Sequence, residues 1–536
     1  MMGDRVIKFL ESVGCCRRCI LIHLGERSDF LYGDLTSINE TIKKTASQLN
    51  IGNEEVETDF QDFSNFEHES NKDAGTDICS EDVEEADEVM KTENSTPEHT
   101  LKKQKCAVCI TCIGLLQSGC SADVVKLLSE AILGSGHDAE YFTLALSFPV
   151  SLSVRVHRVW SLLLQAYPQF PKEGREDHVG TIKDVWKNVV GPQVAAAVGK
   201  SFVIGSHIEF ALIVSCTHIH DVKDCGIMDQ LCGAVFVARQ KKHKKFSKGV
   251  YSKQAVDAAL KKLNDQDFLR VCPDPPSIPD ESVSFSNLHC HHAPLYMAGR
   301  YNKYSRDLPQ TPWFVEGERK LDSSVQELLS QPLKEAVHAT DIKFSSSGRE
   351  DVDVRCLGNG RPFVVEFVNP HRTKFSQAEV TDLQNSINNS TRLIHLRDLQ
   401  IVDRRDIRIL KEGEEEKTKA YCALCIAHKG YDSSVLEKLG RISQLTVQQK
   451  TPLRVLHRRP LATRHRIIHS MRASPVDDHF FKLHLTTQAG TYIKEFVHGD
   501  LGRTSPNLGS ILGLDMDIIA LDVENVALDW PPKCAE

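Results

Sequence analysis

The sequence contains no apolar run of 18 or more residues, the length that a membrane-spanning helix requires. Its first thirteen residues also lack the pattern of a signal peptide, because Asp4, Lys8 and Glu11 interrupt the apolar positions. The same acidic residues argue against a mitochondrial presequence. A hydrophobic share of 41% and a charged share of 26% are ordinary for a globular protein. We therefore expect neither a membrane protein nor a secreted one.

Glycine-rich phosphate-binding loops are also missing. No Gly-x-Gly-x-x-Gly sequence follows a strand-like segment, which argues against a dinucleotide or methyl-donor site. Gly199-Lys200-Ser201 resembles the end of a P-loop, but Val194 stands where the first glycine of that motif belongs. A loop with valine at this position cannot wrap closely around phosphate. The sequence thus argues against a nucleoside triphosphatase.

Negative charge is scarce outside one segment. The whole chain has a formal net charge of −8, but residues 51–100 hold 17 acidic residues and 2 lysines. The rest of the chain has 63 basic and 56 acidic residues, a net charge of +7. Because the acidic segment has few large aliphatic residues, we predict a disordered insertion over residues 50–104. The mildly basic remainder permits a polyanionic partner without requiring one.

Cysteine, in contrast, is plentiful. Seventeen cysteines, an odd number without a secretory signal, favour free thiols in a reducing compartment over a disulfide framework. Two Cys-x-x-Cys pairs have the ligand type and spacing of a closed structural zinc site, because thiolates at i and i+3 reach one tetrahedral ion. These pairs are Cys16 with Cys19 and Cys109 with Cys112. Cys15 and Cys106 offer other registers, and buried free thiols are the alternative to a metal site.

We predict two folded regions around the acidic insertion. An accessory domain comprises residues 1–49 and 105–285 and ends after a proline-rich segment. In it we predict strands over residues 142–148, 151–156 and 202–214, and a helix over residues 254–263. A basic run over residues 239–248 precedes that helix, and RNA contact and a solvated surface are equally good interpretations of it.

The second domain, residues 297–536, is rich in strand-like segments, so we predict an α+β fold. Its predicted elements are a helix that begins at Ser324 with Glu327 as a capping box, a hairpin that turns at Gly358-Asn359-Gly360, a helix over residues 376–388, and strands over residues 393–396, 420–426, 481–486 and 518–523.

The segment Ser347–Arg355 is a polar loop that enters a strand, with three carboxylates and two arginines within nine residues. Because strand side chains alternate, we expect Val352 and Val354 on one face and Asp351 and Asp353 on the other. On these residues alone, a salt-bridge cluster is a better interpretation than a catalytic group.

Two motifs give this segment a further meaning. Gly348-Arg349-Glu350-Asp351 resembles the Gly-Arg-x-Asp motif of pseudouridine synthases. Gly490-Thr-Tyr-Ile-Lys494 resembles a second motif of that superfamily, found in enzymes that act on the T arm of tRNA, and Tyr421 stands in a predicted strand between the two. Residues 299–313 and 450–459 resemble the archaeal and eukaryotic pseudouridine synthase ten family. The resemblance covers nearly the whole chain and is thinnest over residues 20–105.

The resemblance implies a tRNA pseudouridine synthase that isomerises uridine in the T arm. The reaction needs no redox change or group transfer, so we expect no organic cofactor. Asp351 matches the catalytic aspartate, a nucleophile or base, and Lys494 matches the basic residue that pairs with it. Many relatives have arginine in place of Lys494, and lysine keeps the charge but loses the bidentate geometry. Tyr421 matches the tyrosine that stacks on the target base, and help in removing the proton at carbon 5 is a second role that the resemblance implies for it. Glu350 and Asp353 stay open as alternatives to Asp351.

Handling of the RNA is assigned to basic residues. Arg349 matches the arginine that fills the space of the flipped nucleotide, whose removal from its stack costs a few kcal/mol. We predict RNA contacts for Arg300, Lys303, Arg454, Arg458 and Arg459. A solvated charged surface is the alternative interpretation of the basic run from Arg454 to Arg466.

The resemblance also implies the architecture and the partners. We expect a catalytic domain with a mixed, largely antiparallel sheet flanked by helices, and an N-terminal α/β, THUMP-like RNA-binding domain that holds structural zinc. We expect tRNA as the partner, no membrane partner, a monomer, and a location in the nucleus and cytoplasm. One alternative function is a non-catalytic RNA-binding adaptor. A THUMP-containing methyltransferase or thiouridine synthase is a weaker alternative, because its cofactor loop is missing.

Overall fold

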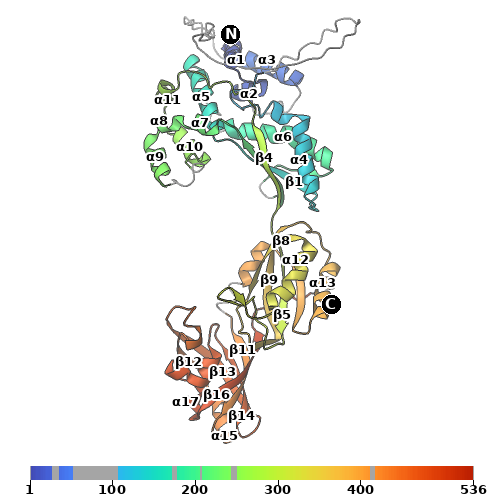
Figure 1. Ribbon diagram of the computed structural model, residues 1–536, viewed down its shortest axis with the longest axis vertical. Helices are drawn as coiled ribbons and strands as arrows, with labels where there is room; N and C mark the ends of the chain where they lie inside the picture. Colours follow the sequence, from blue (N-terminus) through green and yellow to red (C-terminus); the bar gives the residue numbers. More distant parts are fainter. Residues whose placement is uncertain are drawn as a thin grey trace, which may run out of the picture. The chain divides into compact units, whose positions relative to one another are not determined.

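The computed structural model describes residues 2–26, 35–51, 107–171, 178–205, 208–242, 250–410 and 417–534 (Figure 1). The chain divides into two compact units. Unit 1 comprises residues 1–125, 146–191 and 215–286, and unit 2 comprises residues 126–145, 192–214 and 287–536. The predicted accessory and catalytic domains stay predictions. Cys106, residues 243–248 of the basic run, and all but the first two residues of the acidic insertion lie outside the described residues. Within the described ranges, no helix combines the length and the apolar character that crossing a membrane requires.

Unit 1 is predominantly helical. Its helices are α1 (Met2–Ser12), α2 (Arg17–His23), α3 (Leu35–Ile51), α5 (Ser151–Ala166), most of α6 (His178–Val198), α7 (Asp221–Cys225), α8 (Ile227–Leu231), α9 (Gly233–Lys242), α10 (Lys253–Leu260) and α11 (Asp265–Val271). A buried cluster that includes Val154, Phe236, Val256 and Phe268 joins α5 to α9, α10 and α11. Helix α10 confirms the helix predicted from residue 254 onward.

The strand predicted over residues 151–156 is wrong, because this segment begins α5. Leu152, Val154 and Val156 alternate with other residues, but the residues between them are buried too, including Arg155. A helix that is buried on nearly every side shows no clear period, so the local alternation was misleading. Buried Arg155 donates to the carboxylate of Asp224 at 2.7 Å and to two backbone carbonyls.

A sheet of four strands has the order β2-β1-β3-β4. Its strands are β1 (Tyr141–Ser147), β2 (Ser201–Phe202), β3 (Phe210–Thr217) and β4 (Ser284–His292), and α4 (Ala122–Gly134) precedes β1 in the chain. The strand predicted over residues 142–148 is confirmed as β1. The strand predicted over residues 202–214 is two strands, because β2 ends at Phe202 and β3 begins at Phe210.

The large sheet lies in unit 2 and has the order β10-β5-β9-β16-β11-β14-β13-β12-β15, with β8 also paired to β9. Its strands are β5 (Leu295–Lys303), β8 (Ala339–Ser346), β9 (Val354–Pro370), β10 (Ile394–Ile401), β11 (Lys419–Ala427), β12 (Ser443–Lys450), β13 (Thr463–Pro475), β14 (Phe480–Thr487), β15 (Thr504–Ser505) and β16 (Met516–Val526). Strands β9 and β16 are parallel, and the other pairs are antiparallel. The predicted α+β class and the four strands predicted for this half are confirmed.

Helices cover both faces of this sheet. They are α12 (Val325–Val337), α13 (Gln377–Ser390), α15 (Ser433–Leu436), α16 (Ile493–His498) and α17 (Leu508–Leu512), and a short hairpin, β6 (Phe314–Val315) with β7 (Glu318–Arg319), precedes α12. The predicted cap of α12 is confirmed, because the Ser324 hydroxyl accepts a hydrogen bond from the Glu327 backbone N–H at 3.2 Å. The helix predicted over residues 376–388 is confirmed as α13.

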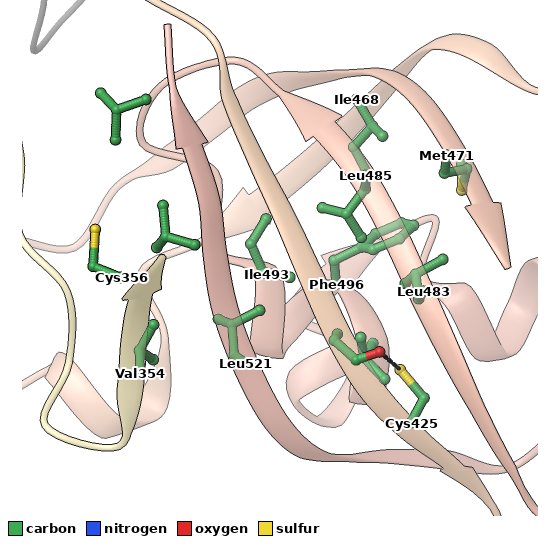
Figure 2. Close-up of a cluster of buried hydrophobic side chains, with 14 of the residues drawn as sticks. Val354, Cys356, Cys425, Ile468, Met471, Leu483, Leu485, Ile493, Phe496 and Leu521 are labelled. Carbon is green, nitrogen blue, oxygen red and sulfur yellow. Dashed lines mark hydrogen bonds between the residues drawn. The ribbon is translucent and has the colours of Figure 1, made fainter. Parts of the chain in front are cut away.

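Two hydrophobic cores lie on opposite faces of β9, because its side chains alternate. Phe363, Val365 and Phe367 belong to the core under α12 and α13. Val354 and Val364 belong to a second core, which α16 covers (Figure 2). The residues of α16 that enter this second core are Ile493, Phe496 and Val497. Burial of that helix face fixes the position of the two residues between them, Lys494 and Glu495.

The hairpin predicted at Gly358-Asn359-Gly360 is wrong, because β9 continues through these residues. Both glycines have positive φ, 56° and 71°, but they serve close approach and not a turn. A Cβ at Gly358 would lie 1.9 Å from the Glu524 carbonyl oxygen, and one at Gly360 would lie 2.8 Å from that of Tyr301. Glycine therefore lets the strands on either side of β9 approach it.

Candidate active site and metal centre

Four cysteines form a compact cluster in unit 1. The thiols of Cys16, Cys19, Cys109 and Cys112 all lie within 4.8 Å of one another. The Sγ atoms of Cys16 and Cys112 are 3.9 Å apart, close to the ~3.8 Å expected for two thiolates on one tetrahedral zinc ion at 2.3 Å. This cluster is compatible with zinc and groups the pair Cys16/Cys19 with the pair Cys109/Cys112, whereas Cys106 lies outside the described residues.

The surroundings of the cluster suit a metal-bound thiolate. The backbone N–H of Cys16 donates to Cys109 Sγ at 3.2 Å. Burial alone would raise the pKa of Cys109, but hydrogen bonds from the other three thiols lower the pKa well below its usual value. The same sharing of protons among the four thiols raises the pKa of Cys19, and burial raises that of Cys112. Cys15, an alternative ligand in the sequence, points elsewhere, with its Sγ 3.2 Å from the Thr111 hydroxyl.

A second group of ligand-type side chains lies on the large sheet. Cys422, His484 and Glu524 come from the neighbouring strands β11, β14 and β16. His484 Nδ1 lies 3.2 Å from Glu524, and its Nε2 lies 3.9 Å from Cys422 Sγ. All three side chains are half-buried, and an ordinary ion pair on a sheet surface accounts for the arrangement.

The loop that precedes β9 carries Asp351. Its start is a tight bend at Gly348, whose φ is 86°, and a Cβ there would lie 2.6 Å from Lys419 Nζ. The strand begins only at Val354, and the Val354 N–H donates to the Asp351 carbonyl at 3.1 Å. The sequence predicted Asp351 and Asp353 on one strand face, whereas the structure places both in the turn before the strand.

Cationic side chains hold the backbone of this loop. Arg361 donates to the Ser347 carbonyl at 2.7 Å. Lys303 Nζ donates to the carbonyls of Asp351 and Val352 at 3.1 and 2.7 Å. Arg306 donates to the Asp353 carbonyl at 2.9 Å. These contacts fix the backbone from which the Asp351 side chain projects.

The Asp351 carboxylate meets two cations through one oxygen. Arg454 Nη1 lies 2.7 Å from Oδ2, and Lys494 Nζ lies 3.8 Å from the same atom. Lys494 is closer to Asp353, at 2.6 and 2.8 Å. The structure therefore brings the predicted pair Asp351 and Lys494 together, but Arg454 makes the shorter contact. Arg454 was predicted to contact RNA, and its position beside Asp351 did not follow from the sequence.

Glu350, an alternative to Asp351 in the sequence, has another role. Its side chain is fully buried and accepts from Arg361 Nε at 2.7 Å. The Tyr301 hydroxyl also donates to it, at 2.8 and 3.0 Å. Gln310 Nε2 in turn donates to the Tyr301 hydroxyl and to the Gly348 carbonyl. This closed network secures the loop from inside and leaves no access for a substrate.

Tyr421 of β11 lies two strands away from β9, the strand that follows the Asp351 loop. In β11 it stands opposite Val523 of β16, which in turn stands opposite Cys356 of β9, so the three side chains share one face. The tyrosine is half-buried against the second core and forms no hydrogen bond with Asp351 in the described structure. Burial raises the pKa of Tyr421 to about 12, which keeps the phenol protonated at neutral pH.

The other predicted RNA-contact residues fall into two groups. Arg349, Arg458 and Arg459 are exposed, and their side chains form no ion pair with any described residue. Arg300 and Lys303 are buried, so the prediction that they contact RNA is corrected. Arg300 donates to five backbone carbonyls, including those of Gly360 and Leu528. Burial lowers the pKa of Lys303 to about 8.

Glu495 was missed by the sequence reading. Its side chain is 2% exposed, and Oε1 accepts from Arg454 Nε at 2.7 Å. Helical spacing gave no signal for it, because Glu495 falls on the side of α16 opposite Ile493 and Val497, where a charged residue is expected to face solvent. The motif that the sequence resembles ends at Lys494, one residue before Glu495.

Two family models match this chain. The model described as "Pus10, C-terminal" matches residues 296–527, and the model described as "Eukaryotic Pus10, N-terminal" matches residues 109–290. The large sheet and the Asp351 loop lie within the first match, and Cys109 and Cys112 lie within the second.

Relatives named tRNA pseudouridine synthase Pus10 cover most of the chain. The protein from Homo sapiens is 46% identical over 432 residues, which is 80% of each chain. The protein from Xenopus laevis is 45% identical over 429 residues, 80% of this chain and 81% of the relative. A solved Cbf5-Nop10-Gar1 complex contains a chain that is 15% identical over 42% of this chain and 47% of its own, with a TM-score of 0.24, below the level from which a shared fold follows.

Proposed function

This chain belongs to the Pus10 family of tRNA pseudouridine synthases, and from that premise we propose that it isomerises uridine to pseudouridine in the T arm of tRNA, with Asp351 as the catalytic carboxylate. The uracil base is detached from its sugar by cleavage of the bond to N1, turned, and rejoined through carbon 5. Carbon 5 then loses its proton and N1 gains one, so no atom other than hydrogen is exchanged and no organic cofactor is required. The target nucleotide must leave its stack, so a stacking surface and a site for the flipped nucleotide are needed beside the carboxylate.

One observation carries the proposal. The Asp351 loop and helix α16 belong to two motifs that lie far apart in the chain, and Lys494 of α16 is 3.8 Å from the Asp351 carboxylate. Asp351 is 34% exposed, so a substrate can reach it, whereas its neighbour Glu350 is inaccessible. Asp353 is 62% exposed but is engaged by Lys494 through both oxygens. Asp351 is therefore the best-placed carboxylate of the three.

Tyr421 and Arg349 have complementary roles in this proposal. Tyr421 stacks on the target base from the sheet face beside Asp351. With a pKa of about 12 it is a poor proton acceptor at neutral pH, so we assign it to stacking and not to removal of the carbon 5 proton. The exposed Arg349 is two residues from Asp351 and fills the gap that the flipped nucleotide leaves.

The four-cysteine cluster holds structural zinc in this proposal. Four thiolates close the coordination sphere, so the ion has no open position for a substrate and stabilises unit 1 instead. Unit 1 acts as the THUMP-like region that grips the tRNA. Arg458 and Arg459, both exposed, add phosphate contacts beside the catalytic site.

Tritium release from tRNA labelled at uridine carbon 5 tests the proposal. We expect release by the wild type and none by Asp351→Asn, with tRNA binding retained in the variant. Asp353→Asn is the matched control, because it removes a neighbouring carboxylate that is also paired with Lys494, and we expect it to keep most of the activity. Full activity in Asp351→Asn with loss in Asp353→Asn would move the catalytic role to Asp353.

The same assay addresses the adaptor alternative. A non-catalytic RNA-binding protein would bind tRNA equally well as wild type and as Asp351→Asn, and neither would release tritium. Mapping of the modified position in the wild-type product then tests the T-arm assignment, since a pseudouridine outside that arm would contradict it.

A further inference from the structure

Helix α16 presents two charged residues in succession, and only the first has a place in the proposed mechanism. Lys494 reaches Asp353 and, at 3.8 Å, Asp351. Glu495 points into the protein and is 2% exposed. Because Ile493, Phe496 and Val497 anchor the helix in the core, Glu495 has a fixed position relative to the sheet.

Arg454 connects Glu495 to Asp351. Its Nε donates to Glu495 Oε1 and its Nη1 donates to Asp351 Oδ2, both at 2.7 Å. Two carboxylates from separate elements thus hold two different edges of one planar guanidinium. Burial alone would lower the pKa of Arg454, but the hydrogen bond and charge of Glu495 outweigh it and raise the pKa. The Arg454 side chain is 38% exposed, and its contacts with the two carboxylates hold the guanidinium in place at the surface.

The buried carboxylate of Glu495 is less favourable for the stability of the protein than a neutral side chain of the same size. Its second oxygen, Oε2, is buried and has no hydrogen-bond partner among the described residues. A buried carboxylate with an unsatisfied oxygen costs free energy that a neutral side chain of the same size would not. Such a group in a native site calls for a functional explanation.

The contacts of Asp351 suggest what the arrangement achieves. Both cations approach the same oxygen, Oδ2. The other oxygen, Oδ1, has no ion-pair or hydrogen-bond partner in the part of the chain that the structure describes. Arg454 thereby fixes the rotation of the carboxylate and leaves one oxygen open on the substrate side.

We propose that Glu495 is a positioning residue for the isomerisation: it holds the Arg454 guanidinium against Oδ2 of Asp351, so that Oδ1 is the oxygen presented to the uridine. This inference rests on the proposed function. It also gives Arg454 a role inside the protein in place of the RNA contact that its basic surroundings indicated.

Single-turnover isomerisation and equilibrium tRNA binding test the inference in the full-length protein. Glu495→Gln keeps the size of the side chain and an oxygen that accepts from Arg454, but removes the charge. We expect an isomerisation rate about tenfold lower, with the dissociation constant for tRNA within about twofold of the wild type. Glu495→Asp keeps the charge but shortens the reach, and we expect a comparable loss of rate.

A double variant separates positioning from a merely structural effect. If Glu495 acts through Arg454, Arg454→Met and the double variant Arg454→Met/Glu495→Gln have the same rate, because the second change has nothing left to act through. The double variant also avoids a buried carboxylate without a partner, so it remains informative if Glu495→Gln alone folds poorly. Glu366→Gln is the control, since it breaks an ion pair with Lys343 on β8 and should leave the rate unchanged.

The outcomes distinguish this inference from the proposed function. A wild type that releases no tritium overturns the function, and with it the inference. A wild type that is active, with Glu495→Gln and Glu495→Asp both within twofold of it, overturns the inference alone. Losses that multiply in the double variant also overturn it, because they mean that Glu495 acts independently of Arg454.

Discussion

The cysteine cluster of unit 1 and the Asp351 cluster of unit 2 are both small groups of charged or chargeable side chains, but they are built differently. The cysteine ligands come in two pairs with fixed spacing, and each pair lies within one local turn. The Asp351 cluster draws two residues from the loop before β9, Asp351 and Asp353, one from the short helical turn Leu453–Val455, and two from α16.

The difference concerns what holds each group together. A single ion can hold four thiolates, so the cluster depends on one bond type and fails as a whole when a ligand is lost. Around Asp351, three carboxylates and two cations are held together by separate ion pairs, and each pair can be removed without the others. We therefore expect all-or-none effects at the first site and graded effects at the second.

Loss of the metal should have the largest effect. Cys109→Ser is expected to abolish zinc binding and unfold the helices around the cluster, because structural zinc supplies about 10–16 kcal/mol in comparable small sites. Metal analysis and circular dichroism of the purified variant check this. Cys15→Ser is the control, since Cys15 contacts Thr111 and not the cluster. A full equivalent of zinc in Cys109→Ser would refute the assigned ligands.

The buried pair beneath the Asp351 loop comes next. Arg361→Met leaves Glu350 buried without its cation and should cost about 3–5 kcal/mol in the free energy of unfolding of unit 2. Urea denaturation measures this. Lys343→Met, which breaks the exposed pair with Glu366, should cost about 1 kcal/mol or less. Equal losses of unfolding free energy in the two variants would show that the buried ion pair contributes no more to stability than the exposed one.

The two cations beside Asp351 should differ in their effect on the rate of isomerisation. Arg454→Met is expected to lower the single-turnover rate about 100-fold and Lys494→Met about tenfold, because Arg454 is 2.7 Å and Lys494 3.8 Å from Asp351. Tritium release under single-turnover conditions gives both rates. A lower rate for Lys494→Met than for Arg454→Met would show that Lys494, the cation that the motif indicates, contributes more to the reaction than its longer distance from Asp351 predicts.

The smallest effect concerns acid stability. Burial alone would raise the pKa of Asp353, but the hydrogen bond and charge of Lys494 leave the pKa below its usual value. A carboxyl group with a lower pKa in the folded state stabilises the protein above its unfolded pKa of about 4, and this stability is lost as the pH falls through the folded pKa. Because Asp353 is 62% exposed, the contribution should stay below about 1 kcal/mol.

Unfolding midpoints measured between pH 5 and pH 2 test this small term. Lys494→Met and Asp353→Asn should reduce the pH dependence of the unfolding midpoint by the same amount. Different slopes for the two variants would show that Lys494 serves a second carboxylate, with Asp351 the nearest one.

Local patterns in the sequence predicted local features well. The spacing of the cysteines indicated the four thiols that form the cluster, the cap at Ser324 indicated the start of α12, and strand-like segments indicated β11, β14 and β16. Alternation failed in α5, where almost every side is buried, and glycine failed as a turn signal in β9, where it serves strand approach. Each failure arose where tertiary packing, and not the local pattern, decides the structure.

The site shows the same limit. The motifs indicated Asp351 and Lys494, and the structure places them together. They did not indicate that Arg454 would make the closer contact or that Glu495 would hold it, because both contacts join elements that are adjacent only after folding. They also could not show that Arg300 and Lys303 point inward and donate to backbone carbonyls, because the sequence does not show whether a basic side chain faces the interior or the solvent.

The parallel pairing of β9 with β16 has a consequence for how the protein is made. Arg355, just after the Asp351 loop, pairs with Asp522, 167 residues later in the chain. At about 5–20 residues per second, a ribosome takes roughly 8–30 seconds to make the segment between them. During that time the nascent chain already contains Asp351, but not the strand that pairs with the start of β9. The Asp351 site therefore cannot assemble until β16 has been made.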